Sequence, residues 1–127
     1  MMEIEGRELT NCEVSADGSV VRLGLRDASG AATVLQLPVD QAGALGMTLP
    51  SLIERALRNR YQDESLRYVH PLGSWVLETT TDPGVVMVTL RTSDGFGVSF
   101  ALAATQREAL GEALQEPVPQ DALTQTH

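Results

Sequence analysis

The chain contains the stretch VVRLGLRDASGAATVLQL at residues 20–37 and a second version of it, VVMVTLRTSDGFGVSFAL, at residues 85–102. An offset of 65 residues aligns the two, and the alignment extends from residues 13–49 onto 78–114 with 13 identities in 37 positions. Unrelated sequences of average composition would share roughly two or three. The chain is therefore an internal duplication, and the apolar alternation inside the repeated stretch decides its fold.

Alternating apolar residues predict a first hairpin around the turn signal Asp17-Gly18. A tight turn there sets the register, so that each inward residue faces another inward residue on the neighbouring strand. The expected inward pairs are Thr10 with Leu25, Cys12 with Leu23 and Val14 with Val21. On the other face, Glu13 is expected to oppose Arg22.

A third strand follows in each copy, over residues 32–37 in the first. The loops before these strands end in Gly30 and Gly95, where the register requires a positive φ. The expected pairs are Leu25 with Thr33 and Leu23 with Leu35 in the first copy, and Leu90 with Val98 and Val88 with Phe100 in the second. The matching glycines are therefore explained by backbone geometry and not by phosphate binding.

A helix is predicted after each third strand. The helices are expected to begin near Asp40 and Thr105, and Thr105 with Glu108 has the spacing of a capping box. Pro50 has no counterpart in the second copy, so it either kinks the first helix or divides it near Thr48. Each helix has an apolar stripe, formed by Leu45, Leu49, Leu52, Ile53, Ala56 and Leu57 in the first and by Ala109, Leu110, Ala113 and Leu114 in the second.

The sequence thus predicts an α+β fold in which a βββα unit occurs twice, with antiparallel sheets packed with two helices about a pseudo-twofold axis. Residues 1–116 are expected to form a single domain from repeats at about 9–60 and 74–116. Because a unit of about 65 residues is marginal alone, the two repeats are expected to share one core. Residues 117–127 lack periodicity and are expected to be a disordered tail.

The composition narrows the classes of function. The net charge of −8 repels phosphate backbones, so nucleic-acid binding is not expected. The absence of lysine excludes Schiff-base chemistry and a P-loop lysine, and Cys12, the only cysteine, excludes a disulfide within the chain. The apolar stretches are shorter than the ~20 residues of a membrane span, and Met2–Glu8 does not resemble a secretory signal. A cytoplasmic location without membrane contact is therefore expected.

The outward faces of the predicted strands carry small side chains, and these form the candidate interaction surface. They are Thr89, Gly97, Ser99 and Ala101 in the second copy, and Gly24, Ala32 and Gln36 in the first. This face is either solvated or an interface with another sheet, a second subunit or a flat ligand. Arg26 and Arg91 end the second strands on the same face, where they either bind an anion as a pair or act as ordinary cross-strand charges.

A few other residues have alternative interpretations. The segment 55–70 is rich in arginine and tyrosine, which suits base stacking, although arginines in a last helical turn also favour the helix dipole. As a general base, His70 would need a nucleophile and an orienting acid, so a packing or capping role is expected instead. The other histidine is His127, so no metal site is expected, and inward-facing Trp75 is expected in the core.

The repeated order of three strands and a helix is similar in outline to tandem PUR or Whirly modules, which bind single-stranded nucleic acid. This resemblance implies a basic, aromatic sheet face. The residues themselves favour a small non-enzymatic interaction protein that forms a homodimer or docks a protein partner, with no cofactor and no catalytic residue. A small enzyme with a cleft between the repeats, holding His70 and Glu78, is the other alternative.

Overall fold

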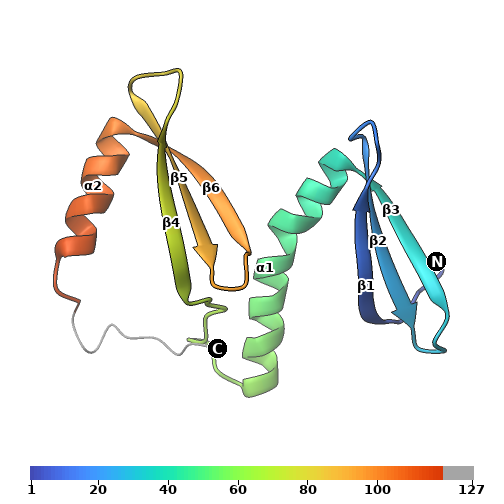
Figure 1. Ribbon diagram of the computed structural model, residues 1–127. Coiled ribbons are helices and arrows are strands. Elements are labelled where there is room, and N and C mark those ends of the chain that lie inside the picture. Colours follow the sequence, from blue (N-terminus) through green and yellow to red (C-terminus); the bar gives the residue numbers. More distant parts are fainter. Residues whose placement is uncertain (119–127) are drawn as a thin grey trace. The chain divides into compact units, whose positions relative to one another are not determined.

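The computed structural model describes residues 1–118 and confirms the α+β fold with two βββα units (Figure 1). Unit 1, Met1–Arg55, contains β1 (Gly6–Val14), β2 (Val20–Asp27) and β3 (Ala32–Pro38). Unit 2, Ala56–His127, contains β4 (Leu72–Thr79), β5 (Val85–Thr92), β6 (Gly97–Ala103) and α2 (Ala104–Gln115). Helix α1 (Val39–Tyr61) includes the boundary. Of the predicted disordered tail, Pro117 and Val118 lie outside the helices and strands, and residues 119–127 lie outside the described residues.

Each unit contains an antiparallel three-stranded sheet whose second strand is central, and the predicted register is confirmed at every pair except one. Leu25 faces Leu9 and not Thr10, because the register of β1 shifts between Leu9 and Cys12. This bulge places Thr10 and Asn11 against Gly24. A Cβ at Gly24 would lie 2.6 Å from the Thr10 hydroxyl and 3.0 Å from the Asn11 carbonyl oxygen, so the bulge requires glycine there.

The bulge changes how the repeats align. Leu9 pairs with Leu25, and Trp75 pairs with Leu90, whereas Leu25 and Leu90 are 65 residues apart. Trp75 therefore corresponds to Leu9 and not, as the constant offset predicts, to Thr10. One residue has been added in β1 or lost from β4. A single-residue bulge is a common way to absorb such a change without turning the rest of the strand over.

The hairpin turns reproduce the predicted glycine geometry. Gly30 and Gly95 have φ angles of 87° and 99°, and each donates its N–H to the residue three positions earlier, Asp27 and Thr92 respectively. In the first copy the Asp27 carboxylate accepts the N–H of Ser29 and of Ala31, both at 2.9 Å. In the second copy the Thr92 hydroxyl accepts the Phe96 N–H at 3.1 Å. Different side chains thus hold the same turn.

The start of each helix is held by a backbone hydrogen bond to the turn of the first hairpin in its unit. The Val39 N–H donates to Ser19 O, and the Ala104 N–H donates to Gly84 O, both at 3.0 Å. These two bonds match across the repeat and place each helix start one residue before the predicted Asp40 and Thr105. The predicted capping box of Thr105 with Glu108 is wrong, because α2 has Ala103 as its N-cap. The Gln106 side chain accepts the Ala103 N–H at 3.0 Å instead.

Helix α1 continues through Pro50 and is not divided near Thr48. It ends at Tyr61, and Gln62, which follows, has a left-handed φ of 52°. The Asp63 N–H donates to Arg58 O at 3.1 Å. The connector after it folds back onto the helix end. The Arg58 Nε donates to Leu66 O at 2.8 Å, and Leu66 and Leu57 are both buried.

The inner faces of the sheets are open. Within residues 1–118, the buried apolar side chains are those of Leu57 and Leu66. The prediction that Trp75 lies in the core is wrong for this structure, because its side chain is 65% exposed, and Leu77 beside it is 58% exposed. The pattern of inward residues is as predicted, but several of these residues on the outer strands are exposed. The prediction of a single domain with one shared core stays a prediction.

Candidate functional site

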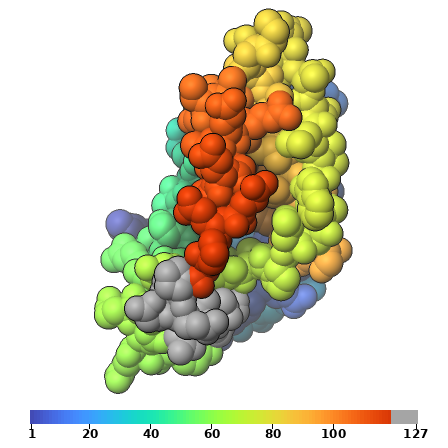
Figure 2. Space-filling model, turned by 90° about the vertical axis from the view of Figure 1, so that its left-hand side faces the viewer, coloured from blue at the N-terminus to red at the C-terminus, as the bar shows by residue number. Residues whose placement is uncertain are grey.

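An apolar groove in unit 2 is the first candidate site. It has a volume of about 570 Å³ and lies between α2 and the inward side of the sheet. We call it the inner groove, and its main apolar side chains are Trp75 and Leu77 of β4, Val88 and Leu90 of β5, and Leu110 and Leu114 of α2. Figure 2 shows α2 in front of the sheet, with β4 alongside.

The groove exists because α2 is short and stands away from its sheet. Leu110 is 47% exposed and Leu114 77% exposed, and both should pack against the sheet if the helix were seated on it. A Cβ at Gly111, which also lines the groove, would have nothing within 4 Å. A helix that packed closely on a sheet would leave no such space. The groove is thus the space between α2 and the sheet that the side chains of unit 2 do not fill.

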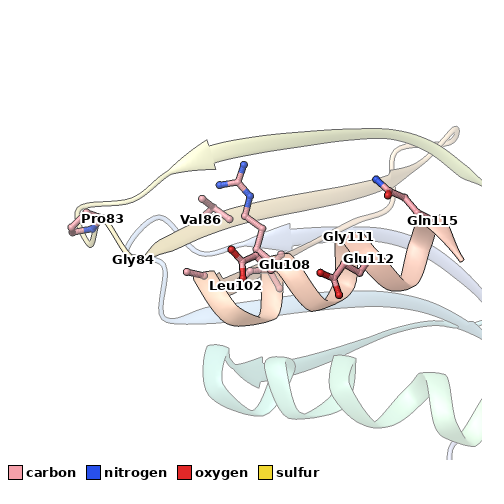
Figure 3. A pocket seen from close by; sticks show the side chains of 10 residues that line it. Pro83, Gly84, Val86, Leu102, Glu108, Gly111, Glu112 and Gln115 are labelled. Atoms are coloured by element: carbon pink, nitrogen blue, oxygen red, sulfur yellow. The ribbon is translucent and has the colours of Figure 1, made fainter.

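A second cavity of about 590 Å³ lies on the other side of α2 (Figure 3). Pro83 and Gly84 line it at the turn between β4 and β5, while Glu108 and Glu112 line it from the helix. Arg107 lines both this cavity and the inner groove. The lining is therefore charged on the helix side and apolar on the sheet side, and it contains no histidine, cysteine, serine or threonine that could act as a nucleophile or base.

The outward face of the second sheet has the composition that the sequence predicts, but its residues differ in accessibility. Thr89 is buried, at 6% exposed, and its hydroxyl shares a hydrogen bond of 2.7 Å with that of Ser99 on β6. The Arg91 side chain lies over Gly97, since a Cβ at Gly97 would be 3.0 Å from Arg91 Cγ and Nη1. Ser99 and Ala101 are exposed. A partner on this face would meet Arg91, Ser99 and Ala101, and Thr89 would act by holding Ser99.

The two arginines of the predicted anion site have equivalent positions in different units. Arg26 pairs with Ala32, and its Nη1 donates to Gly30 O at 3.4 Å. Arg91 pairs with Gly97 in unit 2. Each guanidinium thus lies along its own sheet at the strand end. On the outward face of β4–β6, Arg91 is the basic residue among small and apolar neighbours, which is not the basic, aromatic face implied by the resemblance to PUR or Whirly modules.

His70 lies among aromatic rings. Its ring centroid is 4.8 Å from that of Tyr68 in an edge-to-face arrangement and 5.8 Å from that of Phe96. These rings, with Leu90 and neighbouring residues, line a cavity of about 440 Å³. Glu78, named with His70 in the enzyme alternative, lies opposite Met87 on the outward side of the sheet and does not line that cavity. The structure therefore does not bring the two together.

Carboxylates with shifted pKa values serve as turn caps. The Ser19 hydroxyl, with help from Ser15, lowers the pKa of Asp17 from 3.8 to about 2. Serine hydroxyls likewise lower the pKa of Asp27 and of Asp63, from Ser29 and Ser65 respectively. A general acid needs a raised pKa near the working pH, so these groups are unsuited to that role.

The residues that line the inner groove are recognisable in the sequence as inward-facing, but their pattern predicts a buried core. The inward residues of the second sheet include a tryptophan and several leucines, while the helix that follows has 12 residues. A three-stranded sheet and one short helix seldom bury such a face alone. The small size of the helix relative to the apolar sheet face was therefore the sequence feature that indicated an exposed apolar surface.

Within residues 1–118, no group of three or more histidine, cysteine, aspartate or glutamate side chains is placed to hold a metal ion. No helix in the same residues is long and apolar enough to cross a membrane. Comparison of the chain with protein-family models, with curated proteins and with solved structures finds no match.

Proposed function

We propose that this chain is a small, cytoplasmic, non-enzymatic interaction protein that associates with itself or with a protein partner through a sheet face. The observation that supports it best is the inner groove, where Trp75, Leu77 and Leu114 are each more than half exposed. Exposed apolar surface costs about 25 cal/mol per Å², and contiguous apolar patches on soluble proteins are typical of interfaces. A partner or a second copy of the chain that covers this face would remove its apolar surface from water.

The polar residues support a binding role over a catalytic one. The aspartates with lowered pKa values hold turns, and the cavity beside α2 is lined by glutamates and an arginine, with no histidine, cysteine, serine or threonine among its lining residues. The outward face, with Ser99 and Ala101, is the second surface through which a partner could bind.

The test is light scattering after size exclusion over a concentration series, for the wild-type protein and for Leu77→Arg and Ser99→Arg. The first variant places a charge in the inner groove and the second places one on the outward face. We expect association in the wild type; its loss in Leu77→Arg would assign it to the inner groove, and its loss in Ser99→Arg would assign it to the outward face. Association that survives in both variants would contradict the proposal.

If the wild-type protein stays monomeric, the binding of a different protein partner is tested next. A pull-down from native lysate with the wild type and with Leu77→Arg would then be compared. Proteins retained by the wild type alone would identify a partner of the groove. Identical retention by both proteins would remove the inner groove from the function.

A further inference from the structure

We infer that the open edge of β6 pairs with β6 of a second copy of this chain, so that the two sheets join into one. The inference rests on the proposed function, since it names a second copy as the partner and one strand as the contact. In the second sheet β5 is the central strand, and β4 and β6 are the edges (Figure 1). One side of β6 pairs with β5, and no other described strand pairs with its opposite side. Such an edge presents unpaired backbone N–H and C=O groups, which select another extended strand.

The bonds at the two ends of the β5–β6 hairpin show which backbone groups face the open edge. The Thr92 N–H donates to Phe96 O at 2.8 Å, and the Ala104 N–H donates to Gly84 O at 3.0 Å. Hydrogen-bonded pairs recur at every second residue of an antiparallel ladder. In the register of β5 with β6, the even-numbered residues of β6 therefore bond to β5. The odd-numbered residues direct their N–H and C=O groups toward the open edge, and they are Gly97, Ser99, Ala101 and Ala103.

The start of α2 closes one end of this edge. The Ala103 N–H donates to the Gln106 side chain at 3.0 Å, so its outward group already has a partner. The part of the edge that stays open is Gly97–Ala101, with Ser99 at its centre. An antiparallel copy related by a twofold axis through Ser99 can therefore pair with the whole of this segment. Each Ser99 then faces its own counterpart, and each Gly97 faces the Ala101 of the other copy.

The other three edge strands carry features that discourage strand pairing. β1 contains a bulge as well as Glu8 and Glu13, and β4 has a register shift and Glu78. β3 ends in Pro38. Natural sheets use charges, prolines and bulges in this way to keep their edges unpaired. The sequence of β6, GVSFALA, has no charged residue and no proline, and its register with β5 has no shift, so β6 is the edge that is left able to pair.

The side chains of β6 also suit a second β6. Val98 and Phe100 are 41% and 50% exposed on the inward side, and the twofold register places each Val98 opposite the Phe100 of the other copy. An aromatic residue opposite a β-branched one stabilises an antiparallel pair of strands. Each copy has a net charge of −8, but this contact places no like charges opposite each other, because β6 carries none. A second copy can therefore approach through β6 more closely than through the charged edges.

A proline at the open edge tests the contact in the full-length chain. Ala101→Pro removes an N–H that faces the edge and leaves the bonds to β5 in place, so we expect the sheet to fold, as circular dichroism will verify. Two symmetry-related hydrogen bonds between the copies are lost. The dimer dissociation constant should therefore rise roughly 10- to 100-fold in a light-scattering concentration series. Gln36→Pro is the matched control and should leave this constant unchanged, because Gln36 has the equivalent position on β3, 65 residues earlier.

Amide hydrogen exchange in the wild-type protein gives a readout that needs no substitution. The N–H groups of Val98 and Phe100 bond to β5 and should exchange slowly at every concentration. Those of Ser99 and Ala101 should exchange quickly in dilute samples and roughly tenfold or more slowly in concentrated ones, where the copies pair. An associated protein in which the Ser99 and Ala101 amides still exchange at the dilute rate would refute pairing at this edge.

Three outcomes of the light-scattering series would also overturn the inference. A wild-type protein that stays monomeric excludes self-pairing, and a dimer that Ala101→Pro does not weaken has its contact elsewhere. Equal weakening by Gln36→Pro would assign the contact to β3 as well as β6. The proposed function holds in the second and third cases, since the protein still self-associates, and in the first case it depends on the pull-down.

Discussion

Gly24 and Gly43 illustrate how the same residue type has opposite roles in this chain. Gly24 faces the bulge in β1, and a Cβ there would collide with the side chains of Thr10 and Asn11 and with the Asn11 carbonyl oxygen. Gly43 lies inside α1, and a Cβ there would meet nothing within 4 Å. The first glycine is required by packing, and the second only weakens a helix.

Alanine at the two positions should therefore change stability in opposite directions. We expect Gly24→Ala to lower the free energy of unfolding by about 1–3 kcal/mol, since the bulge must shift to make room. Gly43→Ala should raise it by about 0.5–1 kcal/mol through helix propensity. Urea unfolding followed by circular dichroism measures both. Equal effects of the two substitutions would show that the bulge does not constrain position 24.

Asp17 gives a prediction for the pH dependence of stability. Its pKa is lowered to about 2 in the folded chain, so its stabilising effect is present above the unfolded value near 3.8 and is lost as the pH falls toward 2. Asp17→Asn should lower the unfolding temperature at pH 7, and the difference from wild type should shrink between pH 4 and pH 2. Glu3→Gln, which removes another exposed negative charge, is the control. A difference that is constant from pH 7 to pH 2 would contradict the turn-cap role.

The elements differ in how firmly their ends are defined. Each helix start is fixed by a bond to the preceding hairpin, at Ser19 and Gly84, whereas the end of α1 depends on Gln62 in a left-handed conformation. Non-glycine residues reach that conformation at a cost of about 1–2 kcal/mol. The buried pair Leu57 and Leu66 and the Arg58 bond to Leu66 compensate for this cost. The helix end is thus stabilised by the connector that follows it.

Relief of that backbone cost should be measurable. Gln62→Gly should raise the free energy of unfolding by about 0.5–1 kcal/mol, because glycine reaches a positive φ without the Cβ clash, although it gains more entropy on unfolding. The same substitution at Asn59, in the last turn of α1, should instead destabilise by about 0.3 kcal/mol. Thermal unfolding of both variants provides the comparison. A loss of stability in Gln62→Gly would mean that its side chain contributes more than the strain costs.

At the scale of the whole molecule, the feature that matters most is the apolar surface left open. Trp75, Leu77 and Leu114 are exposed in unit 2, as are Leu9 and Leu35 on the corresponding side of unit 1. Both units repeat the same imbalance between a large apolar sheet face and a small cover. The duplication thus places an exposed apolar sheet face in each unit. For this reason we propose association as the function.

This surface should bind a hydrophobic fluorescent dye in a concentration-dependent way. Dye fluorescence per chain should be high in dilute samples, where the inner groove is open, and should fall as the concentration rises and copies cover each other. Dye binding per chain that is independent of concentration in the wild type would argue against self-association through the inner groove.

Local sequence patterns predict the duplication, the six strands and two helices, and nearly all of the strand register, because these depend on local alternation, turn glycines and helix spacing. They also predict which side chains face inward. Tertiary structure alone decided the bulge at Thr10 and Asn11, the N-cap at Ala103 and the open state of the inner groove. Those features depend on how segments meet in space: a bulge needs the opposite strand, a cap needs the carbonyl of a distant turn, and an apolar residue is buried only where another layer covers it. The alternation that marks Trp75 as inward cannot say whether that layer comes from the same unit or from another molecule.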